Sequence, residues 1–395
     1  MNVPFFDLKR QYACLQPEVE PAVLAALESC GYIGGRAVSD FEHKLAAYLN
    51  ASHAVACGNG TEALVLALRA CGVQPGDEVI TTPFTFFATA EAVASIGAVP
   101  VFVDIDPADF NLAAEEVEAK ITERTRAILP VHLFGAPCDM DAIMEIARRH
   151  GLKVIEDAAQ AIGCEYKGQK IGSTADVSCF SFYPTKNLGG MGDGGIVTTG
   201  NGDLALILRA LREHGAGKQG ADARALLDGS TAEPTALQET GGGYDPYKYC
   251  NSLIAYNSRL DAVQAAVLSV KLDHLKNYNE RRADIAAFYS KNLCDSVVKP
   301  SARPGGKHCW HQYVIRTAHK EKLCAFLNEK GIGVGTFYPI PLHLQKAFDY
   351  LGYTRGDCPN AERAARETVC LPIFPELRQE EMEYVVRQVN AFFEQ

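Results

Sequence analysis

Short apolar segments recur through the first half of the chain, and helical stretches separate most of them. The segments that predict strands are 53–57, 78–82, 99–103, 127–131, 153–155, 177–182 and 196–199. Strands that alternate with helices predict an α/β fold with a largely parallel sheet covered by helices on both faces. Such a sheet binds ligands at the carboxyl ends of its strands.

Apolar residues at helical spacing predict the helices. Residues 17–29 carry Val19, Val23 and Leu27 on one face, and a glycine-rich break at 31–35 follows. A second helix is predicted to begin at Ser39. Further helices are predicted at 63–71, 87–95, 141–150, 261–275, 321–330 and 379–393.

The length of 395 residues exceeds one ordinary domain. We predict a large domain at 1–260 and a smaller α/β domain at 261–395, with the helix at 261–275 linking the two. The remainder alternates strand and helix, beginning with a strand at 311–316.

Residues 215–250 differ from the rest of the chain. The segment is rich in Gly, Ala, Asp and Thr and shows no apolar period. We therefore predict a long surface loop, of a length that is usually functional or mobile. A lid and an additional dimer contact are both open as its role.

Charge and cysteine content limit the possible partners and location. The net charge of −10 argues against a nucleic-acid or anionic-membrane surface. No apolar stretch has the length of a membrane span, and the N-terminus has no apolar core of signal-peptide length. The thirteen cysteines are odd in number and include no C-x-x-C pair, which suits reduced thiols. We expect a soluble cytoplasmic protein with no nucleic-acid or membrane partner.

Two charged residues stand at or just past strand ends. Asp157 follows the segment 153–155, and Lys186 follows the segment 177–182 in a glycine-rich turn. A pyridoxal 5'-phosphate site requires such a pair, because the lysine amine bonds to the cofactor aldehyde and the aspartate keeps the pyridine nitrogen protonated. The alternatives are a helix N-cap for Asp157 and an ordinary solvated side chain for Lys186. Glu156 points to the opposite side of the strand, so we expect no cofactor role for it.

The run Gly58-Asn59-Gly60-Thr61 joins a predicted strand to a helix. Backbone amides at a helix N-terminus and the Thr61 hydroxyl suit a phosphate group. The run also fits a loose dinucleotide-binding pattern. That interpretation is weak, because Thr81 and Thr82 stand at the end of the next strand where a ribose-binding acid is needed.

Three runs together are highly specific: Glu156-Asp157-Ala158-Ala159-Gln160, the run Ser181 to Gly189 (SFYPTKNLG), and Gly192-Asp193-Gly194-Gly195. They resemble the DegT/DnrJ/EryC1/StrS family of sugar aminotransferases, and the resemblance covers nearly the whole chain. It implies aminotransferase fold type I, with a seven-stranded, mostly parallel sheet and a smaller α/β C-terminal domain. It also implies the cofactor pyridoxal 5'-phosphate.

The resemblance assigns roles residue by residue. Lys186 and Asp157 are the implied catalytic residues, and Gln160 bonds the cofactor's ring hydroxyl. Phe86 matches the aromatic residue that stacks on the ring. The implied phosphate ligands are Gly60, Thr61, Ser181 and, from the neighbouring subunit, Asn257. The last of these implies a homodimer with shared active sites.

The same resemblance implies the substrates, a nucleotide-linked keto sugar and L-glutamate as amino donor. The implied substrate contacts are Tyr183, Arg259, Tyr338 and His343, with Arg259 near the diphosphate. A surface position is an equal alternative for His343. The glycine-rich turn after Lys186 resembles enzymes that act at a 3-keto position more than the threonine-rich turn of 4-keto enzymes.

Three alternatives bear on this assignment. Sugar dehydratases of the family replace the lysine with histidine, so Lys186 argues against that reaction. Regulatory relatives can lose the lysine or the aspartate, and here both are present. The run His308-Cys309-Trp310-His311 fits no standard zinc spacing. We therefore predict no metal there and assign the run to a structural strand.

Overall fold

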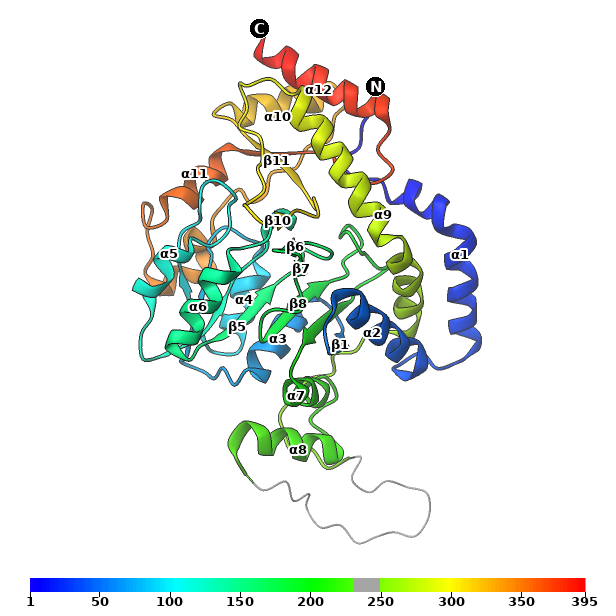
Figure 1. Ribbon diagram of the computed structural model, residues 1–395, viewed down its shortest axis with the longest axis vertical. Coiled ribbons are helices and arrows are strands. Elements are labelled where there is room, and N and C mark those ends of the chain that lie inside the picture. The colour runs from blue at the N-terminus through cyan, green and yellow to red at the C-terminus, as the bar shows by residue number, and fades with distance from the viewer. Residues whose placement is uncertain (231–248, 395) are drawn as a thin grey trace.

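The computed structural model describes residues 1–230 and 249–394. Its centre is a seven-stranded sheet with the order β1-β9-β8-β5-β4-β2-β3 (Figure 1). The strands are β1 (His53–Cys57), β2 (Glu78–Thr81), β3 (Val99–Phe102), β4 (Thr125–Leu129), β5 (Lys153–Asp157), β8 (Val177–Ser181) and β9 (Gly195–Thr199). Strand β9 is antiparallel to both neighbours, and the remaining pairs are parallel. The predicted sheet is therefore confirmed, and its strands form because their β-branched and apolar residues are buried on both faces.

Helices cover both faces of this sheet. One apolar cluster joins the sheet to α3 (Gly60–Ala70), α4 (Ala88–Ser95), α7 (Gly202–Arg212) and α11 (Pro359–Glu367). A second cluster, on the other face, joins it to α2 (Gly35–Leu49), α6 (Met140–His150) and α9 (Ala262–Asn292). Short elements complete this part: α5 (Ala114–Val117), η1 (Glu118–Lys120), η2 (Leu133–Gly135), β6 (Glu165–Tyr166), β7 (Gln169–Lys170), β10 (Gly306–Lys307), η4 (Leu342–Leu344) and η5 (Lys346–Leu351).

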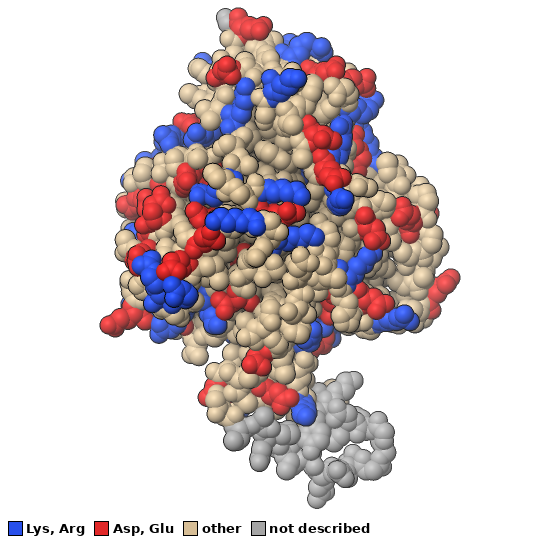
Figure 2. All heavy atoms as spheres, viewed as in Figure 1, with Lys and Arg blue, Asp and Glu red and all other residues tan. Residues whose placement is uncertain are grey.

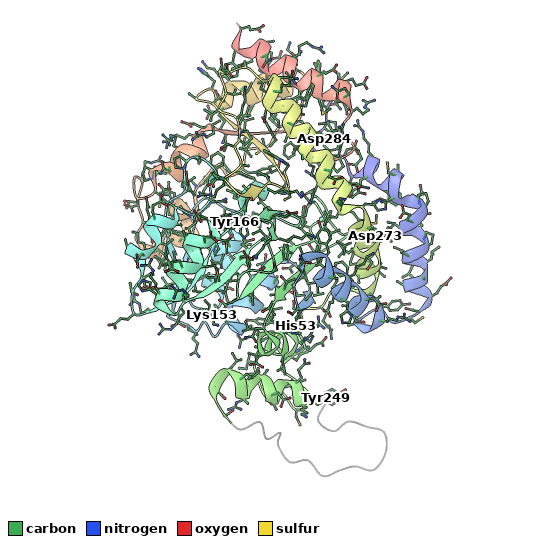
Figure 3. The ribbon with its side chains drawn as sticks, in the orientation of Figure 1. His53, Lys153, Tyr166, Tyr249, Asp273 and Asp284 are labelled. Atoms are coloured by element: carbon green, nitrogen blue, oxygen red, sulfur yellow. The ribbon has the colours of Figure 1, made fainter. Side chains whose placement is uncertain are left out.

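The C-terminal part has its own small sheet and core. Strands β11 (Tyr313–Arg316) and β12 (Thr368–Leu371) pair antiparallel beside α10 (Lys320–Glu329) and α12 (Gln379–Phe393). Helix α9 is shared, because Leu268 packs in the core of the large sheet and Tyr289 in the C-terminal core. Figure 3 shows Asp273 and Asp284 along this helix. The division at residue 261 stays a prediction, since one helix serves both cores.

Three helices are longer than their predicted ranges. Helix α1 (Leu8–Glu28) begins well before residue 17, because the Asp7 carboxylate accepts hydrogen bonds from the amides of Lys9 and Arg10 at 3.0 and 3.1 Å. Helix α2 begins at Gly35 rather than Ser39. Helix α9 continues past residue 275 to Asn292.

The prediction of a loop throughout 215–250 is wrong in its first half. Residues Gly217–Asp228 form helix α8, which packs on α7 away from the sheet (Figure 1). A Cβ atom at Gly220 would lie 1.9 Å from the Gly215 carbonyl oxygen, so small residues allow this close packing. Small buried residues carry no apolar period, which explains why the pattern did not predict a helix. Residues 231–248 lie outside the described residues.

Charged side chains of both signs alternate over the face seen in Figure 2. Several form exposed ion pairs one helical turn apart, such as Arg148 with Glu145 at 2.8 Å. Among the described residues, none of the helices combines the length and apolar character that crossing a bilayer requires.

Candidate active site

The sheet brings several predicted site residues together at the carboxyl-terminal ends of its central strands. Asp157 is the last residue of β5, and Ser181 is the last residue of the parallel neighbour β8. Antiparallel strand β9 begins at this same end of the sheet, where Gly195 pairs with both Cys57 and Ser181. The carboxyl ends of β1, β5 and β8 therefore lie together, as expected for a ligand site in such a sheet.

Asp157 is buried, with 6% of its surface exposed. Its Oδ2 atom accepts a hydrogen bond from the Thr89 hydroxyl at 2.8 Å, and its Oδ1 atom accepts one from the Ala159 amide at 3.1 Å. Burial raises the pKa of the carboxyl, whereas these hydrogen bonds and the Lys186 charge oppose that shift. Turns rather than a helix follow Asp157, so it is no helix N-cap.

Lys186 lies partly buried in the turn that follows β8. Its backbone amide donates to the Tyr183 carbonyl at 2.8 Å. A Cβ atom at Gly189 would lie 2.2 Å from the Pro184 carbonyl oxygen, so this tight turn requires glycine there. Burial lowers the pKa of the Lys186 ammonium to about 8, and the Asp157 carboxylate opposes this shift. An amine with this pKa is mostly protonated at pH 7 but has a far larger neutral fraction than an ordinary lysine, as a nucleophile or a proton acceptor requires.

The N-terminus of α3 closes the site at the end of β1. The Asn59 side chain caps this helix by accepting a hydrogen bond from the Glu62 amide at 2.9 Å. A Cβ atom at Gly60 would lie 2.6 Å from the Ser181 Cβ atom, so the helix start touches the end of β8. The backbone at Gly60 and Thr61 and the Ser181 hydroxyl thus adjoin one another and form a cradle for an anion.

Ser258 belongs to this cradle, and the sequence patterns did not identify it. Its Oγ atom accepts a hydrogen bond from the Gly58 amide at 3.2 Å, and its hydroxyl donates to the Glu62 carboxylate. Ser258 is 1% exposed and ties the segment at 257–260 to the start of α3. No local pattern marks a serine with this role, because the contact joins residues that are distant in the sequence.

Aromatic side chains separate into core and site positions. Phe84 is fully buried, and Phe87 packs on Phe348 with a ring-centroid distance of 5.3 Å. Phe86 is 58% exposed and lies 6.3 Å from the Tyr338 ring. Among the three phenylalanines of this run, the structure therefore leaves Phe86 available to a ligand.

Gln160 connects this aromatic group to the backbone behind it. Its Oε1 atom accepts a hydrogen bond from the Phe134 amide at 2.8 Å, and its Nε2 atom donates to the Tyr338 hydroxyl at 2.9 Å. Because the Phe134 amide can only donate, the orientation of the Gln160 amide is fixed. The Nε2 atom therefore presents a hydrogen-bond donor next to Tyr338.

These groups fit pyridoxal 5'-phosphate. A lysine with a lowered pKa suits the aldehyde, a buried carboxylate suits the pyridine nitrogen, and the cradle at Gly60 and Ser181 suits the phosphate. The family model described as the DegT/DnrJ/EryC1/StrS aminotransferase family matches residues 13–390. The chain belongs to this family.

Relatives of the DegT/DnrJ/EryC1/StrS family align over nearly the whole chain. A pleiotropic regulatory protein of Geobacillus stearothermophilus is 47% identical, with 100% of this chain and 99% of the relative covered. A UDP-N-acetyl-3-dehydro-alpha-D-glucosamine 3-aminotransferase of Acidithiobacillus ferrooxidans is 40% identical, with 96% and 95% covered. The crystal structure of DesV of S. venezuelae, in complex with a ketimine intermediate, has a TM-score of 0.90 at 40% identity and covers 100% and 99%.

These comparisons confirm three predictions. The fold is that of pyridoxal-phosphate-dependent aminotransferases, and the chain is a sugar aminotransferase. The cofactor is pyridoxal 5'-phosphate, since solved structures of relatives hold this group or its amine form. The individual roles of the site residues stay predictions of the family resemblance.

Two predicted residues of this DegT/DnrJ/EryC1/StrS member face outward. Asn257 is exposed, and its backbone forms an antiparallel bridge with Glu213. Arg259 is partly exposed and pairs with the Glu213 carboxylate at 3.3 Å. Ser258 between them points inward, so residues 257–259 alternate in direction as extended backbone does.

The two remaining substrate predictions differ in placement. Tyr183 is 55% exposed beside the Lys186 turn. His343 is 2% exposed, and its Nε2 atom lies 3.3 Å from the Glu362 Oε1 atom. The surface position considered for His343 disagrees with this buried placement, whereas its contact with the sugar stays a prediction of the family resemblance.

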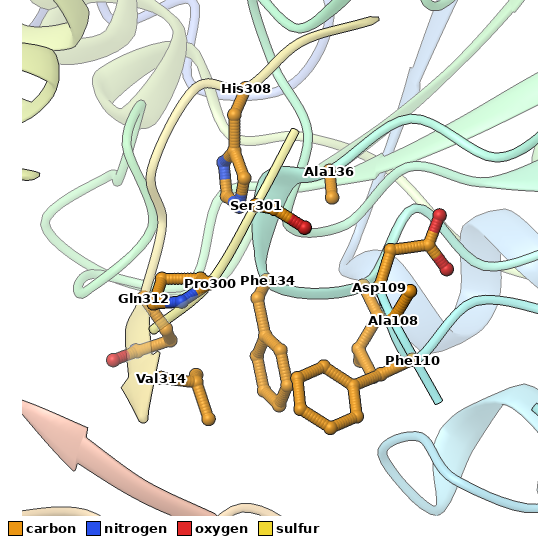
Figure 4. A pocket seen from close by; sticks show the side chains of 11 residues that line it. Ala108, Asp109, Phe110, Phe134, Ala136, Pro300, Ser301, His308, Gln312 and Val314 are labelled. Atoms are coloured by element: carbon orange, nitrogen blue, oxygen red, sulfur yellow. The ribbon is translucent and has the colours of Figure 1, made fainter. Parts of the chain in front are cut away.

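The strand predicted for His308–His311 is wrong. This segment is irregular, Trp310 has a φ of 54°, and the His308 ring stacks on the Trp310 ring at 4.0 Å. His308 and Gln312 line a cavity beside Phe110 and Phe134 (Figure 4). The cavity has a volume of about 10 Å³, which is room for one water molecule and too little for a substrate.

Proposed function

We propose that the enzyme transfers an amino group from L-glutamate to a keto sugar carried on a nucleotide. The observation that carries the proposal is the pair formed by Lys186, with its pKa of about 8, and the buried Asp157. The product is an amino sugar for glycan or natural-product biosynthesis. The cysteine pattern supports a cytoplasmic location.

Lys186 and Asp157 divide the chemistry between them. When bound, pyridoxal phosphate accepts electrons from the substrate carbon and carries the amino group from donor to acceptor. Lys186 would hold the cofactor through its Nζ atom and, once released, would accept and return the proton of the substrate carbon. Its lowered pKa suits this task, because the amine accepts and returns the proton near neutral pH. Asp157 accepts the hydrogen bond of the pyridine nitrogen and stabilises its protonated form.

The surrounding residues hold and orient the cofactor. Gln160 would donate from its Nε2 atom to the ring hydroxyl, and the exposed Phe86 ring would stack on the pyridine. Gly60, Thr61 and Ser181 of one chain would bind the phosphate, together with Asn257 from a second copy of the chain. The outward direction of Asn257 supports this homodimer, because an exposed side chain is available to a partner's site.

Tyr183, Tyr338 and Arg259 are the proposed substrate contacts. Tyr183 and Tyr338 lie on the Lys186 and Phe86 sides of the site, and Arg259 supplies a positive charge for the diphosphate. Arg259 is paired with Glu213, so binding of the diphosphate exchanges one anionic partner for another. His343 is a further proposed contact, and its buried ring lies beside Glu362.

We favour reaction at a 3-keto position over a 4-keto position. The glycine-rich turn after Lys186 supports this choice, and so does the relative whose name specifies a 3-aminotransferase. A test offers UDP-linked and dTDP-linked sugars with a ketone at either position and locates the new amino group by NMR. Amination at the 4-position alone would contradict the choice.

The reaction itself is tested by following both halves. The purified enzyme with pyridoxal phosphate should convert glutamate to 2-oxoglutarate in an amount equal to the enzyme, and continuous turnover should require the keto sugar. The Lys186→Ala variant should bind the cofactor only reversibly and produce neither product. Turnover by that variant at more than about a thousandth of the wild-type rate would exclude the role of Lys186.

A further inference from the structure

Asn187 directly follows Lys186 and is held by three polar partners. It is 4% exposed. Its Nδ2 atom donates to the Asn279 Oδ1 atom and to the Cys309 carbonyl oxygen, both at 2.8 Å. Its Oδ1 atom lies 3.2 Å from the Nδ1 atom of His311. The turn that carries Lys186 is thus fixed to α9 and to the segment at 309–311.

The hydrogen-bond directions in this group determine the tautomer of His311. The Asn279 Nδ2 atom donates to the Ile162 carbonyl oxygen at 3.0 Å, so the Asn279 Oδ1 atom is the acceptor for Asn187. Both Nδ2 protons of Asn187 then point to acceptors, and its Oδ1 atom must accept. His311 therefore carries its proton on Nδ1 and donates it to Asn187.

His311 is neutral as well as buried. Its exposed fraction is 6%, and burial together with the Lys186 and Arg282 charges lowers the pKa of its imidazole well below the usual value. Arg282 also donates to the His311 carbonyl at 3.3 Å and to the Trp310 carbonyl at 3.1 Å, which fixes the backbone of this segment. The imidazole is therefore a rigid neutral donor placed behind the Lys186 turn.

We infer that His311 is a positioning residue that acts through Asn187 to hold the Lys186 amine in its partly buried place beyond the carboxyl end of β8. The inference rests on the proposed role of Lys186. Without the His311 donor, the buried Asn187 oxygen is left unpaired, at a free-energy cost that favours its rotation. Rotation of Asn187 also breaks its two other bonds, and the adjacent Lys186 then gains freedom to reach solvent.

Two variants of His311 separate this role from a direct contact with Lys186. The amide nitrogen of asparagine stands two bonds from Cβ, as does the Nδ1 atom of histidine, so His311→Asn retains the donor to Asn187. The amide nitrogen of glutamine stands three bonds from Cβ, as does the Nε2 atom, so His311→Gln loses that donor and keeps polarity on the far side of the ring. His308→Gln is a matched control, because His308 lies partly buried in the same segment and lines the small cavity instead (Figure 4).

The readout is the reactivity of the Lys186 amine in the cofactor-free protein. Trace labelling with acetic anhydride across pH, followed by mass spectrometry of the peptide that contains Lys186, gives the midpoint of its titration. We expect His311→Gln to move the midpoint upward by about one pH unit or more, toward the value of an exposed lysine. His311→Asn and His308→Gln should stay close to the wild type.

The opposite order, with His311→Asn shifted and His311→Gln unchanged, would overturn the inference in favour of a direct contact. Equal midpoints in all variants, or equal shifts in all three, would also overturn it. Covalent uptake of pyridoxal phosphate by Lys186→Ala is a separate outcome. It would refute the proposed role of Lys186 and leave the labelling result to be judged by itself.

Discussion

Asp157 and Lys186 each depend on the other for their chemistry. Burial favours the neutral form of both groups, and the charge of each favours the charged form of the other. Glu156, the preceding residue on β5, lies in a different environment, where its carboxylate accepts hydrogen bonds from the Ser178 and Thr174 hydroxyls. One strand thus carries two carboxylates in different surroundings, Asp157 close to Lys186 and Glu156 bonded to hydroxyl groups within the protein.

The lowered pKa of Lys186 predicts a pH-dependent stability. An unfolded lysine has a pKa of about 10.4, whereas that of folded Lys186 is about 8. Between these values the unfolded chain binds more protons, so this residue's contribution to stability rises with pH. Below pH 8 the buried lysine destabilises the fold. Lys186→Met should therefore stabilise the cofactor-free protein by about 1–2 kcal/mol at pH 7. The gain is smaller than the pKa shift alone implies, because the variant also removes the positive charge that stabilises the Asp157 carboxylate.

Chemical denaturation of the cofactor-free wild type and variant at pH 7 and pH 10 measures this difference. We expect the advantage of the variant to shrink toward zero at the higher pH. Lys276→Met is the control, because that side chain is 79% exposed and its removal should give no pH-dependent change. A variant that is equally stable at pH 7, or equally favoured at pH 10, would contradict the prediction.

At the scale of elements, the site depends on how closely α3 approaches β8 and β9. Glycine allows this approach at two positions. A Cβ atom added at Gly60 would lie 2.6 Å from the Ser181 Cβ atom. A Cβ atom added at Gly195 would lie 2.3 Å from the Asn59 carbonyl oxygen. The helix N-terminus can present its amides to a phosphate only while these contacts hold.

Gly60→Ala should therefore weaken cofactor binding. The added methyl group forces α3 and the end of β8 apart, and the phosphate loses aligned amide donors. We expect the dissociation constant of pyridoxal phosphate to rise by about tenfold or more, as for the loss of about 1.4 kcal/mol. Equilibrium titration of the cofactor-free protein measures it. Gly200→Ala is the matched control, since a Cβ atom there has nothing within 4 Å, and equal effects of both variants would refute the prediction.

The elements also differ in how well their sequences predicted them. The sequence predicts the seven strands of the large sheet because strands buried on both faces are short, continuous apolar runs. Helix α8 was missed because its buried face consists of Gly220, Ala221 and Ala223, which give no apolar period. The strand expected at 308–311 rests on excluding a zinc site by its spacing, which does not test the backbone, and Arg282 binds the carbonyl groups of Trp310 and His311 in an irregular segment.

At the scale of the whole molecule, one chain leaves the proposed site incomplete. Lys186 and Asp157 come from the large sheet, whereas Asn257 faces outward and is proposed to serve a second copy. Mixing two inactive variants tests this arrangement. Lys186→Ala and Asn257→Ala chains, unfolded together and refolded, should recover activity, because each mixed dimer contains one site with both residues intact.

The expected recovery is about a quarter of the wild-type activity, since half of the dimers are mixed and each has one active site of two. Each variant refolded alone is the control and should remain below about a tenth of that level. No recovery in the mixture, with dimers present by sedimentation, would show that Asn257 acts within its own chain.

The sequence by itself determined the family, the cofactor and the parallel sheet. Local runs carry that information, because the strand patterns and the residues around Asp157 and Lys186 are each contiguous in the chain. The tertiary structure decided what depends on distant residues meeting. It exposed Phe86 and buried Phe84, enclosed His343 against Glu362, and brought Ser258 to the cradle. Which side chain of a run is covered, and which distant groups form hydrogen bonds, depends on contacts that exist only when the chain folds, so patterns of neighbouring residues do not determine these details.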